Sequence, residues 1–377
     1  MQLFKENSTG QSFWETLLSD SENLSKEAMY PKSLSPSFDW ELMFKEFFTA
    51  FHYNKKVQEA VKTRLFVGSR KSPELIHKIA EKPPNATESL ETWGESLFEG
   101  LPWCIVLDKI SGCIDDLSTE VATWMSPYFQ TLDPGSFSTD ISPYVGRYGY
   151  TPFGAHLDID GISVLHLHMG PGIKEMTIWP EDEFRHITGS NALNCYDFEP
   201  YLKHGKTYTI EPGDIFHLPA STYYHIARAD AFSVGITIGL KHENAQSMLK
   251  KAMNTFQKDP NKSDIKTALE QFKWRRNSNC GFMKPPLIRS MDLPWQETYR
   301  FKRIVPFPIH LGLSSEGKTM AFARGRRIPG YLSPDQVDLI EQLNQDHPIS
   351  FSQIASSKSL VSLTEQLYSF KAITEVM

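Results

Sequence analysis

The sequence predicts an α+β protein in which a small antiparallel β-barrel or jelly roll lies between helical segments. Three observations lead to this fold class. Apolar residues recur at helical intervals in the first hundred residues and again after residue 243. The middle of the chain carries strand-like segments and tight turns. The 377 residues are 40% hydrophobic, which is enough for two or three domains with a sizeable core.

The first hundred residues are expected to be helical and to pack on the barrel. In DWELMFKEFFTAFHYNKKVQEAV the apolar side chains follow a helical period. They are Leu42, Phe44, Phe47, Phe48 and Phe51. The polar, proline-containing EKPPNATES predicts a loop. LPWCIVLDKI then predicts the entry to the barrel sheet, and STEVATWMSPYFQTL predicts a helix before the remaining strands.

The stretch GAHLDIDGISVLHLH places a histidine and a carboxylate two residues apart in a strand-like segment. Side chains of a strand alternate between its faces, so His156 and Asp158 should project side by side, roughly 6 to 7 Å apart. Downstream, TYTIEPGDIFHLP predicts a strand, a tight turn and a strand, because Pro and Gly favour the central positions of a turn. The turn should set the two strands antiparallel. His225 follows the second of them.

Each of these residues also has an ordinary structural explanation. A histidine and an aspartate at this spacing often form only a surface or core pair, and His225 beside Tyr223 and Tyr224 could be a core histidine. The combination favours a metal site, because the pair follows a glycine-rich entry and the distal histidine follows a Pro-Gly-Asp turn. Two imidazoles and one carboxylate, with coordination positions left open, suit a non-haem Fe(II) oxygenase.

Together, GAHLD, PGDIFHLPASTYYHIA and SVGITIGL resemble the JmjC-type, cupin-fold 2-oxoglutarate oxygenases, and within them the ribosomal oxygenase branch. The resemblance is firmest over residues 99–241. It implies a double-stranded β-helix (jelly-roll) core with Fe(II) bound by His156, Asp158 and His225. It also implies 2-oxoglutarate as the cosubstrate, which is converted to succinate and CO₂ while a C–H bond is hydroxylated.

The resemblance further implies that a Lys or Arg on the strand after the H-x-D pair holds the distal carboxylate of 2-oxoglutarate. Lys174 in MGPGIKEMTIWP matches it, although the loop is longer than in the family pattern. A buried carboxylate needs a charged donor to offset its desolvation; a solvated hairpin lysine is the alternative. A hydroxyl from Tyr148 or Thr151 is expected to share the carboxylate, unless both are ordinary strand residues.

More histidines lie near the triad than one metal ion needs. His166, His168 and His217 fall in strand-like sequence. An extended metal cluster is one interpretation, but interior hydrogen bonding is the better one, because ligating imidazoles are usually oriented by outer partners. Asp160 would share the face of Asp158 if the strand continued, and we expect it at the rim near the substrate.

The segments after the barrel predict two further parts. NAQSMLKKAMNTFQ and SDIKTALEQFKWRR have amphipathic helical patterns and should form an αα-hairpin. The resemblance favours a homodimer surface there, within residues 242–275. Strand-like segments then flank the turn SSEGK, and three short helical segments follow, the first beginning at Ser333-Pro334. This tail predicts a winged-helix-like domain.

A winged-helix shape raises DNA binding as an alternative function. A basic cluster supports it slightly: Arg324, Arg326 and Arg327. The last helix, however, carries Glu365 and Leu367 with only Lys371 as a cation, too little to neutralise several phosphates. The net charge of −6 is also unlike that of a chain built to coat nucleic acid. We expect a structural or docking role for the tail and no nucleic-acid partner.

Cysteine spacing and the amino-terminal sequence bear on the compartment. Cys104, Cys113, Cys195 and Cys280 form no C-x-x-C pair, so neither a zinc knuckle nor a disulfide framework is predicted. The first residues lack a signal-peptide pattern, and no apolar run reaches the roughly 18 residues of a membrane helix. We expect a cytoplasmic protein with free thiols and no membrane partner.

The predicted organisation is an N-terminal helical region (1–98), a catalytic domain (99–241), a helical dimerisation segment (242–290) and a winged-helix-like domain (291–377). Three functions stay open. Hydroxylation of a protein or peptide side chain is favoured, because the resemblance is to protein-modifying enzymes. Hydroxylation or desaturation of a small molecule is second, and N-terminal helices that narrow the barrel mouth would favour it. A non-catalytic binding module is third, and the complete triad together with Lys174 argues against it.

Overall fold

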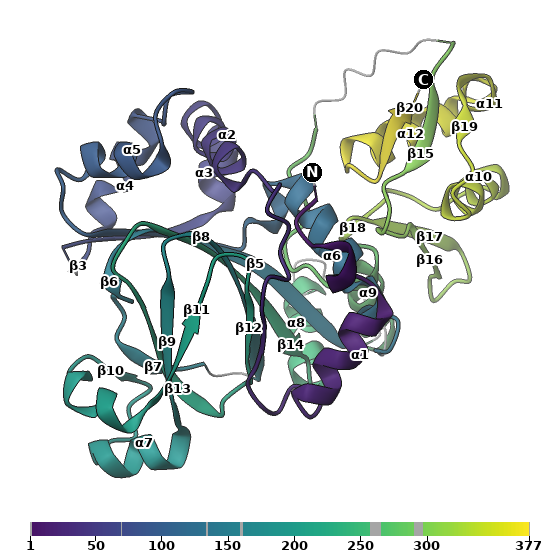
Figure 1. Ribbon diagram of the computed structural model, residues 1–377. Helices are drawn as coiled ribbons and strands as arrows, with labels where there is room; N and C mark the ends of the chain where they lie inside the picture. Colours follow the sequence, from purple (N-terminus) through teal and green to yellow (C-terminus); the bar gives the residue numbers. More distant parts are fainter. Residues whose placement is uncertain are drawn as a thin grey trace. The chain divides into compact units, whose positions relative to one another are not determined.

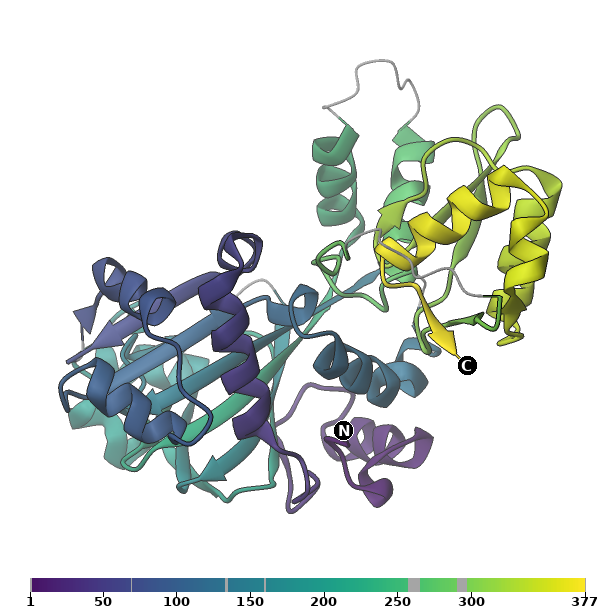
Figure 2. The ribbon, with the colours of Figure 1, turned by 90° about the horizontal axis from the view of Figure 1, so that it is seen from above.

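The computed structural model describes residues 2–68, 70–132, 135–158, 161–256, 265–289 and 297–376. The chain forms two compact units. Unit 1 comprises Met1–Glu120 and Asp140–Lys241, and unit 2 comprises Val121–Thr139 and His242–Met377. Figure 1 and Figure 2 show their helices and strands from two directions. The mixed α and β content and the antiparallel pairing predicted from the sequence are confirmed.

The larger sheet has the strand order β1-β12-β8-β14-β5-β4-β2-β3. Its strands are β1 (Ala28–Tyr30), β2 (Lys62–Val67), β3 (Arg70–Lys71), β4 (Trp103–Asp108), β5 (Phe137–Arg147), β8 (Ile162–Pro171), β12 (Ile215–Leu218) and β14 (Ser233–His242). In β4, which LPWCIVLDKI predicted, five successive residues are buried. A strand buried on both faces requires such a continuous apolar run.

The smaller sheet has the strand order β10-β7-β13-β9-β11, and β6 pairs with β13. Its strands are β6 (Gly149–Tyr150), β7 (Ala155–Leu157), β9 (Lys174–Pro180), β10 (Asn194–Cys195), β11 (Lys206–Ile210) and β13 (Tyr223–Ala229). The helix α7 (Glu181–Thr188) packs on this sheet, where the Phe184 ring stacks on Tyr224 with centroids 4.5 Å apart.

A buried apolar cluster joins the two sheets. Met176 and Ile178 of β9 and Ile210 of β11 belong to the same cluster as Phe216 and Leu218 of β12. The predicted Pro-Gly-Asp turn connects β11 to β12, but these strands form no hairpin, because β11 pairs with β9 and β12 pairs with β8. The turn instead carries the chain from one sheet to the other.

The N-terminal region contains helices, as predicted, but it is not purely helical, because it also contributes β1, β2 and β3 to the large sheet. The helical pattern of residues 39–61 is also broken. Asn54 ends α2 (Trp40–Tyr53) and caps α3 (Lys55–Ala60) by accepting a hydrogen bond from the Lys56 N–H. The buried face of α2 carries Met43, Phe44, Phe47, Phe48 and Phe51. Leu42, which we placed in this apolar set, is instead 49% exposed.

Aromatic contacts pack these helices on the large sheet. The Phe48 ring of α2 lies 4.8 Å from that of Trp93 in α5, and Trp93 lies 6.4 Å from Trp103 of β4. The predicted loop EKPPNATES separates α4 from α5. The other helices and 3₁₀ turns before residue 205 are η1 (Glu6–Ser8), α1 (Gln11–Asp20), η2 (Pro73–Leu75), α4 (Ile76–Glu81), α5 (Leu90–Leu97), η3 (Ile110–Gly112), α6 (Asp115–Phe129) and η4 (Glu199–His204).

Unit 2 contains the two predicted amphipathic helices, α8 (Ala245–Phe256) and α9 (Ile265–Asn277), whose apolar faces pack on one another. The hairpin predicted across SSEGK is present, because β16 (His310–Leu313) pairs antiparallel with β17 (Thr319–Ala323). The remaining elements are β15 (Arg300–Arg303), β18 (Arg326–Arg327), α10 (Pro334–Asn344), β19 (Ile349–Ser350), α11 (Phe351–Ala355), α12 (Lys358–Ser369) and β20 (Ile373–Val376).

The C-terminal helices share one core with the strands of unit 2. Leu343 of α10 and Leu367 of α12 lie in a buried cluster with Phe301 of β15. Leu367, considered above for a DNA-reading helix, is fully buried. Arg324, from the predicted basic cluster, is 1% exposed and lies 3.5 Å from the centroid of the Phe307 ring. Both residues therefore stabilise the unit from inside.

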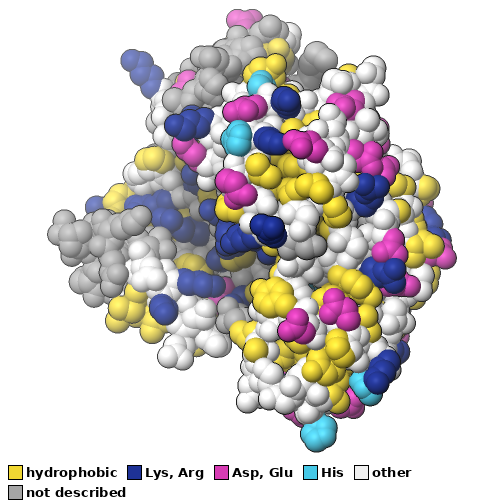
Figure 3. Space-filling view, turned by 90° about the vertical axis from the view of Figure 1, so that its left-hand side faces the viewer, with side chains coloured by type: hydrophobic (Ala, Val, Ile, Leu, Met, Phe, Trp, Pro, Cys, Tyr) yellow, Lys and Arg dark blue, Asp and Glu magenta, His cyan; other side chains and the backbone are white. Residues whose placement is uncertain are grey.

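The surface mixes charge types. On the face in Figure 3, basic and acidic side chains are interspersed with apolar ones.

Over the described ranges, no helix combines the length and apolarity that crossing a bilayer requires.

Candidate functional site

The three residues predicted as metal ligands lie together in unit 1. His156 on β7 and His225 on β13 are direct cross-strand partners, and their ring centroids are 4.1 Å apart. Asp158 follows β7, and its carboxylate oxygens lie 4.0 Å from His156 Nε2 and 3.9 Å from His225 Nε2. The three ligand atoms all lie within 4.8 Å of one another. Such spacing suits three ligands on one side of a single ion.

Backbone contacts around the triad orient its side chains. Gly154 has a φ of +75°, and a Cβ there would lie 2.4 Å from the carbonyl oxygen of Cys195, so the position requires glycine. The Gly154 carbonyl lies 3.2 Å from His156 Nδ1. This bond needs the proton on Nδ1, which leaves Nε2 able to coordinate. The N–H and hydroxyl of Ser221 both donate to the carbonyl of Asp158 at 3.1 Å.

Burial keeps both imidazoles of the triad neutral. Burial lowers the pKa of His156 to about 3, with a further contribution from His225, and lowers the pKa of His225 to about 4. Burial also raises the pKa of Asp158, against the opposing effect of His156. Neutral imidazole is the form that binds metals. A carboxylate that is costly to bury beside two neutral imidazoles would be stabilised by a cation.

A cavity of about 100 Å³ lies in front of the triad and receives side chains from both sheets. The large sheet contributes Tyr144, Val164, His166 and Thr237, and the small sheet contributes Lys174, Met176 and Ala227. Thr151 and Phe153, between β6 and β7, also line it.

Two of the three residues predicted to hold a cosubstrate line this cavity: Lys174 and Thr151. Tyr148 does not, and is buried instead in an apolar cluster with Phe66. Tyr144 lines the cavity and was missed by the sequence reasoning. The two tyrosines are four residues apart, so strand alternation alone assigns them to the same face and cannot distinguish them.

Lys174 is the first residue of β9 and is only 5% exposed. In the described part of the chain its ammonium has no hydrogen-bond or ion-pair partner, and the Tyr144 ring centroid lies 5.7 Å away. Burial lowers the pKa of Lys174 to about 8. A buried ammonium without a counter-ion is costly, and a bound anion would offset that cost.

The additional histidines have different surroundings. His166 lines the cavity, and its Nε2 is buried with no hydrogen-bond partner among the described residues. His168 Nε2 lies 2.6 Å from the Gly172 carbonyl, and His217 Nδ1 lies 2.9 Å from the Lys26 carbonyl. These two form the interior hydrogen bonds that we predicted. Asp160 lies outside the described residues.

Arg64 of β2 is a charged residue near the site that the sequence did not indicate. Its guanidinium pairs with Asp108 at 2.8 Å and lies 5.7 Å from the ring centroid of Phe153. It also contributes to the lowered pKa of His156. No motif marks Arg64, because its position depends on the pairing of β2 with β4.

The triad is the one group of residues in the described chain with the spacing of metal ligands. Apart from it, residues 2–68, 70–132, 135–158, 161–256, 265–289 and 297–376 contain no group of three His, Cys, Asp or Glu residues with metal-ligand spacing. The four cysteines are free thiols, which agrees with the predicted lack of a disulfide framework.

Comparison with known proteins identifies the fold. No family model and no curated protein matches the chain. Solved structures do match, among them E. coli ycfD with a TM-score of 0.55 and 13% identity. YcfD, described as a ribosomal oxygenase from Escherichia coli, matches in complex with cobalt and succinic acid (0.55, 12%) and with cobalt and 2-oxoglutarate (0.55, 13%). Each match covers 100% of this chain and 99% of the other. The predicted likeness to the ribosomal oxygenases is thereby confirmed at the level of the fold.

Proposed function

We propose that this protein is an Fe(II)- and 2-oxoglutarate-dependent oxygenase that hydroxylates an unactivated C–H bond, on a protein or peptide side chain. One observation carries the proposal: the triad His156, Asp158 and His225 lines the same small cavity as the buried, unpaired Lys174. The likeness in fold to an oxygenase described in complexes with cobalt and 2-oxoglutarate adds support.

The donor set of the cavity fits Fe(II) and 2-oxoglutarate. Two neutral imidazoles and one carboxylate are ligands that non-haem Fe(II) accepts. The burial that raises the pKa of Asp158 would be offset by a divalent cation beside it. We assign His156, Asp158 and His225 as metal ligands and Lys174 as the group that binds the distal carboxylate. When bound, iron and 2-oxoglutarate supply the oxidising chemistry, which no side chain can provide.

The side chains of the cavity would bind and orient the cosubstrate and exclude water. Lys174 offers a charge-assisted hydrogen bond to a carboxylate. Among the described residues, Thr151 Oγ1 accepts a hydrogen bond from the Ala227 N–H, at 3.4 Å, and donates none, so its proton can be donated to the same carboxylate. We propose the Tyr144 hydroxyl as a further hydrogen-bond donor to this carboxylate. Tyr148 would instead contribute only to the apolar cluster in which it is buried. The apolar part of the lining, Phe153, Val164, Met176 and Ala227, would limit the access of water to a site where water would waste the oxidant.

We favour a protein or peptide substrate over a small molecule, because the cavity of about 100 Å³ beside the triad must also hold the cosubstrate, and a side chain needs only to present its tip there. The description of YcfD as a ribosomal oxygenase agrees with this choice.

We also propose how the other segments serve this function. The helices of residues 1–98 would pack on the barrel, to whose large sheet β1, β2 and β3 of the same region belong. Residues 99–241 would form the rest of the catalytic double-stranded β-helix, and the helices within 242–275 would provide a homodimer surface. The C-terminal domain, 291–377, would serve docking or stability. The burial of Leu367 and Arg324 supports this over DNA reading, because neither side chain is available to phosphates or bases.

The proposal is tested by succinate production. Purified protein with Fe(II), ascorbate and 2-oxoglutarate should form succinate slowly without substrate, and His156→Ala should abolish this turnover. His347→Ala, at an exposed position of unit 2, is the matched control and should leave turnover unchanged. Equal turnover in His156→Ala would exclude the assigned site. If the unsubstituted protein forms succinate, a search for a 16-Da mass increase among peptides and metabolites will distinguish a protein or peptide substrate from a small molecule.

A further inference from the structure

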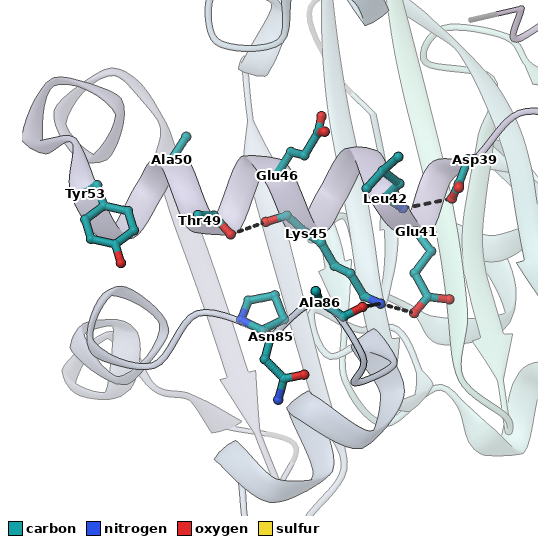
Figure 4. Close-up of a pocket in the computed structure, with 11 residues that line it drawn as sticks. Asp39, Glu41, Leu42, Lys45, Glu46, Thr49, Ala50, Tyr53, Asn85 and Ala86 are labelled. Carbon is teal, nitrogen blue, oxygen red and sulfur yellow. Dashed lines mark hydrogen bonds and ion pairs between the residues drawn. The ribbon is translucent and has the colours of Figure 1, made fainter.

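An open groove of about 740 Å³ runs along α2 in unit 1, well apart in the sequence from the triad. One wall is formed by α2 residues and the other by Pro84, Asn85 and Ala86 of the loop before α5. Figure 4 shows Tyr53 at one end of the helix and Leu42 with Asp39 at the other. The function proposed above does not use this groove.

Two large apolar side chains stand exposed on this face of α2. Leu42 is 49% exposed and Tyr53 is 79% exposed, whereas the opposite face of the helix is buried. They are eleven positions apart in the sequence, which is about three helical turns and about 16 Å along the axis. They therefore lie on the same face, as two apolar points at the ends of one groove.

The charged groups of the groove are mainly acidic. Its lining holds the carboxylates Asp39, Glu41 and Glu46 and one ammonium, Lys45. Lys45 is already engaged, because its Nζ lies 3.1 Å from Glu41 and 3.5 Å from the carbonyl of Ala86. These contacts are drawn in Figure 4.

The other two carboxylates, Glu46 and Asp39, can still form ion pairs with a binding partner. Glu46 has no hydrogen-bond or ion-pair partner among the described residues. Asp39 uses one carboxylate oxygen to accept from the Leu42 N–H, as the N-cap of α2. Both negative charges lie on the same groove as the two exposed apolar side chains.

We propose that this groove binds a basic, extended peptide segment of another protein. Its apolar side chains would contact Leu42 and Tyr53, and its Lys or Arg side chains would pair with Glu46 and Asp39. An extended chain rises roughly 3.3 Å per residue, so about six residues reach from one apolar point to the other. Charge complementarity selects a cationic partner, because an acidic segment or a nucleic acid would face unpaired carboxylates.

The inference is independent of the proposed oxygenase activity, and its test measures binding alone. The probe is a fluorescein-labelled peptide of about six residues with photo-reactive leucine analogues at its ends and lysines between them. Matched peptides replace the lysines by glutamate or the end residues by serine. Fluorescence anisotropy of the full-length protein gives the affinity, and mass spectrometry of the photo-crosslinked product gives the contact site.

The lysine peptide should bind more tightly than both matched peptides and should crosslink to α2 or to residues 84–86. Glu46→Gln should weaken binding about threefold and Glu46→Lys about tenfold, and added salt should weaken it further. Leu42→Gln or Tyr53→Gln should each weaken it at least about fivefold. The exposed controls Glu15→Gln and Leu313→Gln should leave the affinity unchanged.

Three results would overturn the inference. One is equal binding of the lysine and glutamate peptides, and another is crosslinking that maps elsewhere. The third is concentration-dependent self-association that Leu42→Gln abolishes, because the occupant would then be a second copy of this chain. Circular dichroism of each variant checks that α2 is intact.

Discussion

Lys174→Met should stabilise the free protein while it weakens 2-oxoglutarate binding, a pair of opposite effects that only a buried binding cation would produce. Burial lowers the pKa of Lys174 from 10.5 to about 8, a difference equivalent to about 3 kcal/mol of destabilisation of the charged form. Methionine keeps the length of the side chain without its charge. The free energy of unfolding at pH 7 should therefore rise by up to about 3 kcal/mol.

The pH dependence of this gain has a definite sign. Between pH 8 and pH 10.5 the unfolded chain holds the Lys174 proton more tightly than the folded protein does. Raising the pH through this window therefore stabilises the unsubstituted protein relative to its unfolded state. The advantage of Lys174→Met should be full below about pH 8 and should disappear by about pH 10.5. Urea unfolding at pH 7 and pH 10.5 measures both values, with the exposed Lys71→Met as control.

The second half of the prediction is the loss of affinity. Removing one partner of a buried charge pair costs about 2 to 5 kcal/mol, so Kd for 2-oxoglutarate should rise at least about 30-fold. Titration calorimetry with Mn(II) present measures it without turnover. Lys174→Arg should retain part of the affinity, because the charge is kept. A Lys174→Met protein that is less stable at pH 7, or that binds 2-oxoglutarate as before, would refute the reasoning.

Three further predictions concern stability. Burial raises the pKa of Asp140 to about 6, so Asp140→Asn should raise the free energy of unfolding by about 2 kcal/mol at pH 7; a gain of the same size at pH 4 would contradict this. Burial opposes ionisation of Glu243, but hydrogen bonds from Lys251 and two serines lower its pKa to about 2. Glu243→Gln should lose about 2 to 3 kcal/mol in urea unfolding at pH 7 and almost nothing at pH 2. Gly94→Ala would place a Cβ 1.9 Å from the Trp103 ring and should cost about 1 to 3 kcal/mol in thermal unfolding, unlike an exposed helical alanine substitution.

The helices and the local part of the triad could be predicted because both follow short-range periodicity. His156 and Asp158 lie two residues apart, and strand alternation alone puts them on one face. The pairing of His156 with His225 depends instead on the register between β7 and β13, which join residues about seventy positions apart. The motif context and the resemblance suggested that contact, but strand alternation could not, because register is set by the whole sheet rather than by the two segments.

Two local predictions have a similar physical limit. Leu42 fits the apolar period of α2 and yet faces solvent, since Met43 and Phe44 fill the buried side beside it. Tyr148 and Tyr144 have the same strand parity, but β5 ends at Arg147 and only Tyr144 reaches the cavity. In both cases periodicity identifies a face, and tertiary packing decides which residue of that face is used.

The charges of the cavity explain why metal and cosubstrate would suit it together better than separately. The lining holds the acid Asp158, whose pKa is raised by burial, the ammonium of Lys174, and the neutral imidazoles of His156 and His225. A divalent cation alone would add two unbalanced positive charges to a buried site, and a dicarboxylate alone would add two negative ones. Added together they leave the net charge unchanged, so each should strengthen the binding of the other by the same factor. In the proposed oxygenase, the unpaired ammonium of Lys174 would bind the cosubstrate and the carboxylate of Asp158 would bind the metal, so the two groups would serve one binding site.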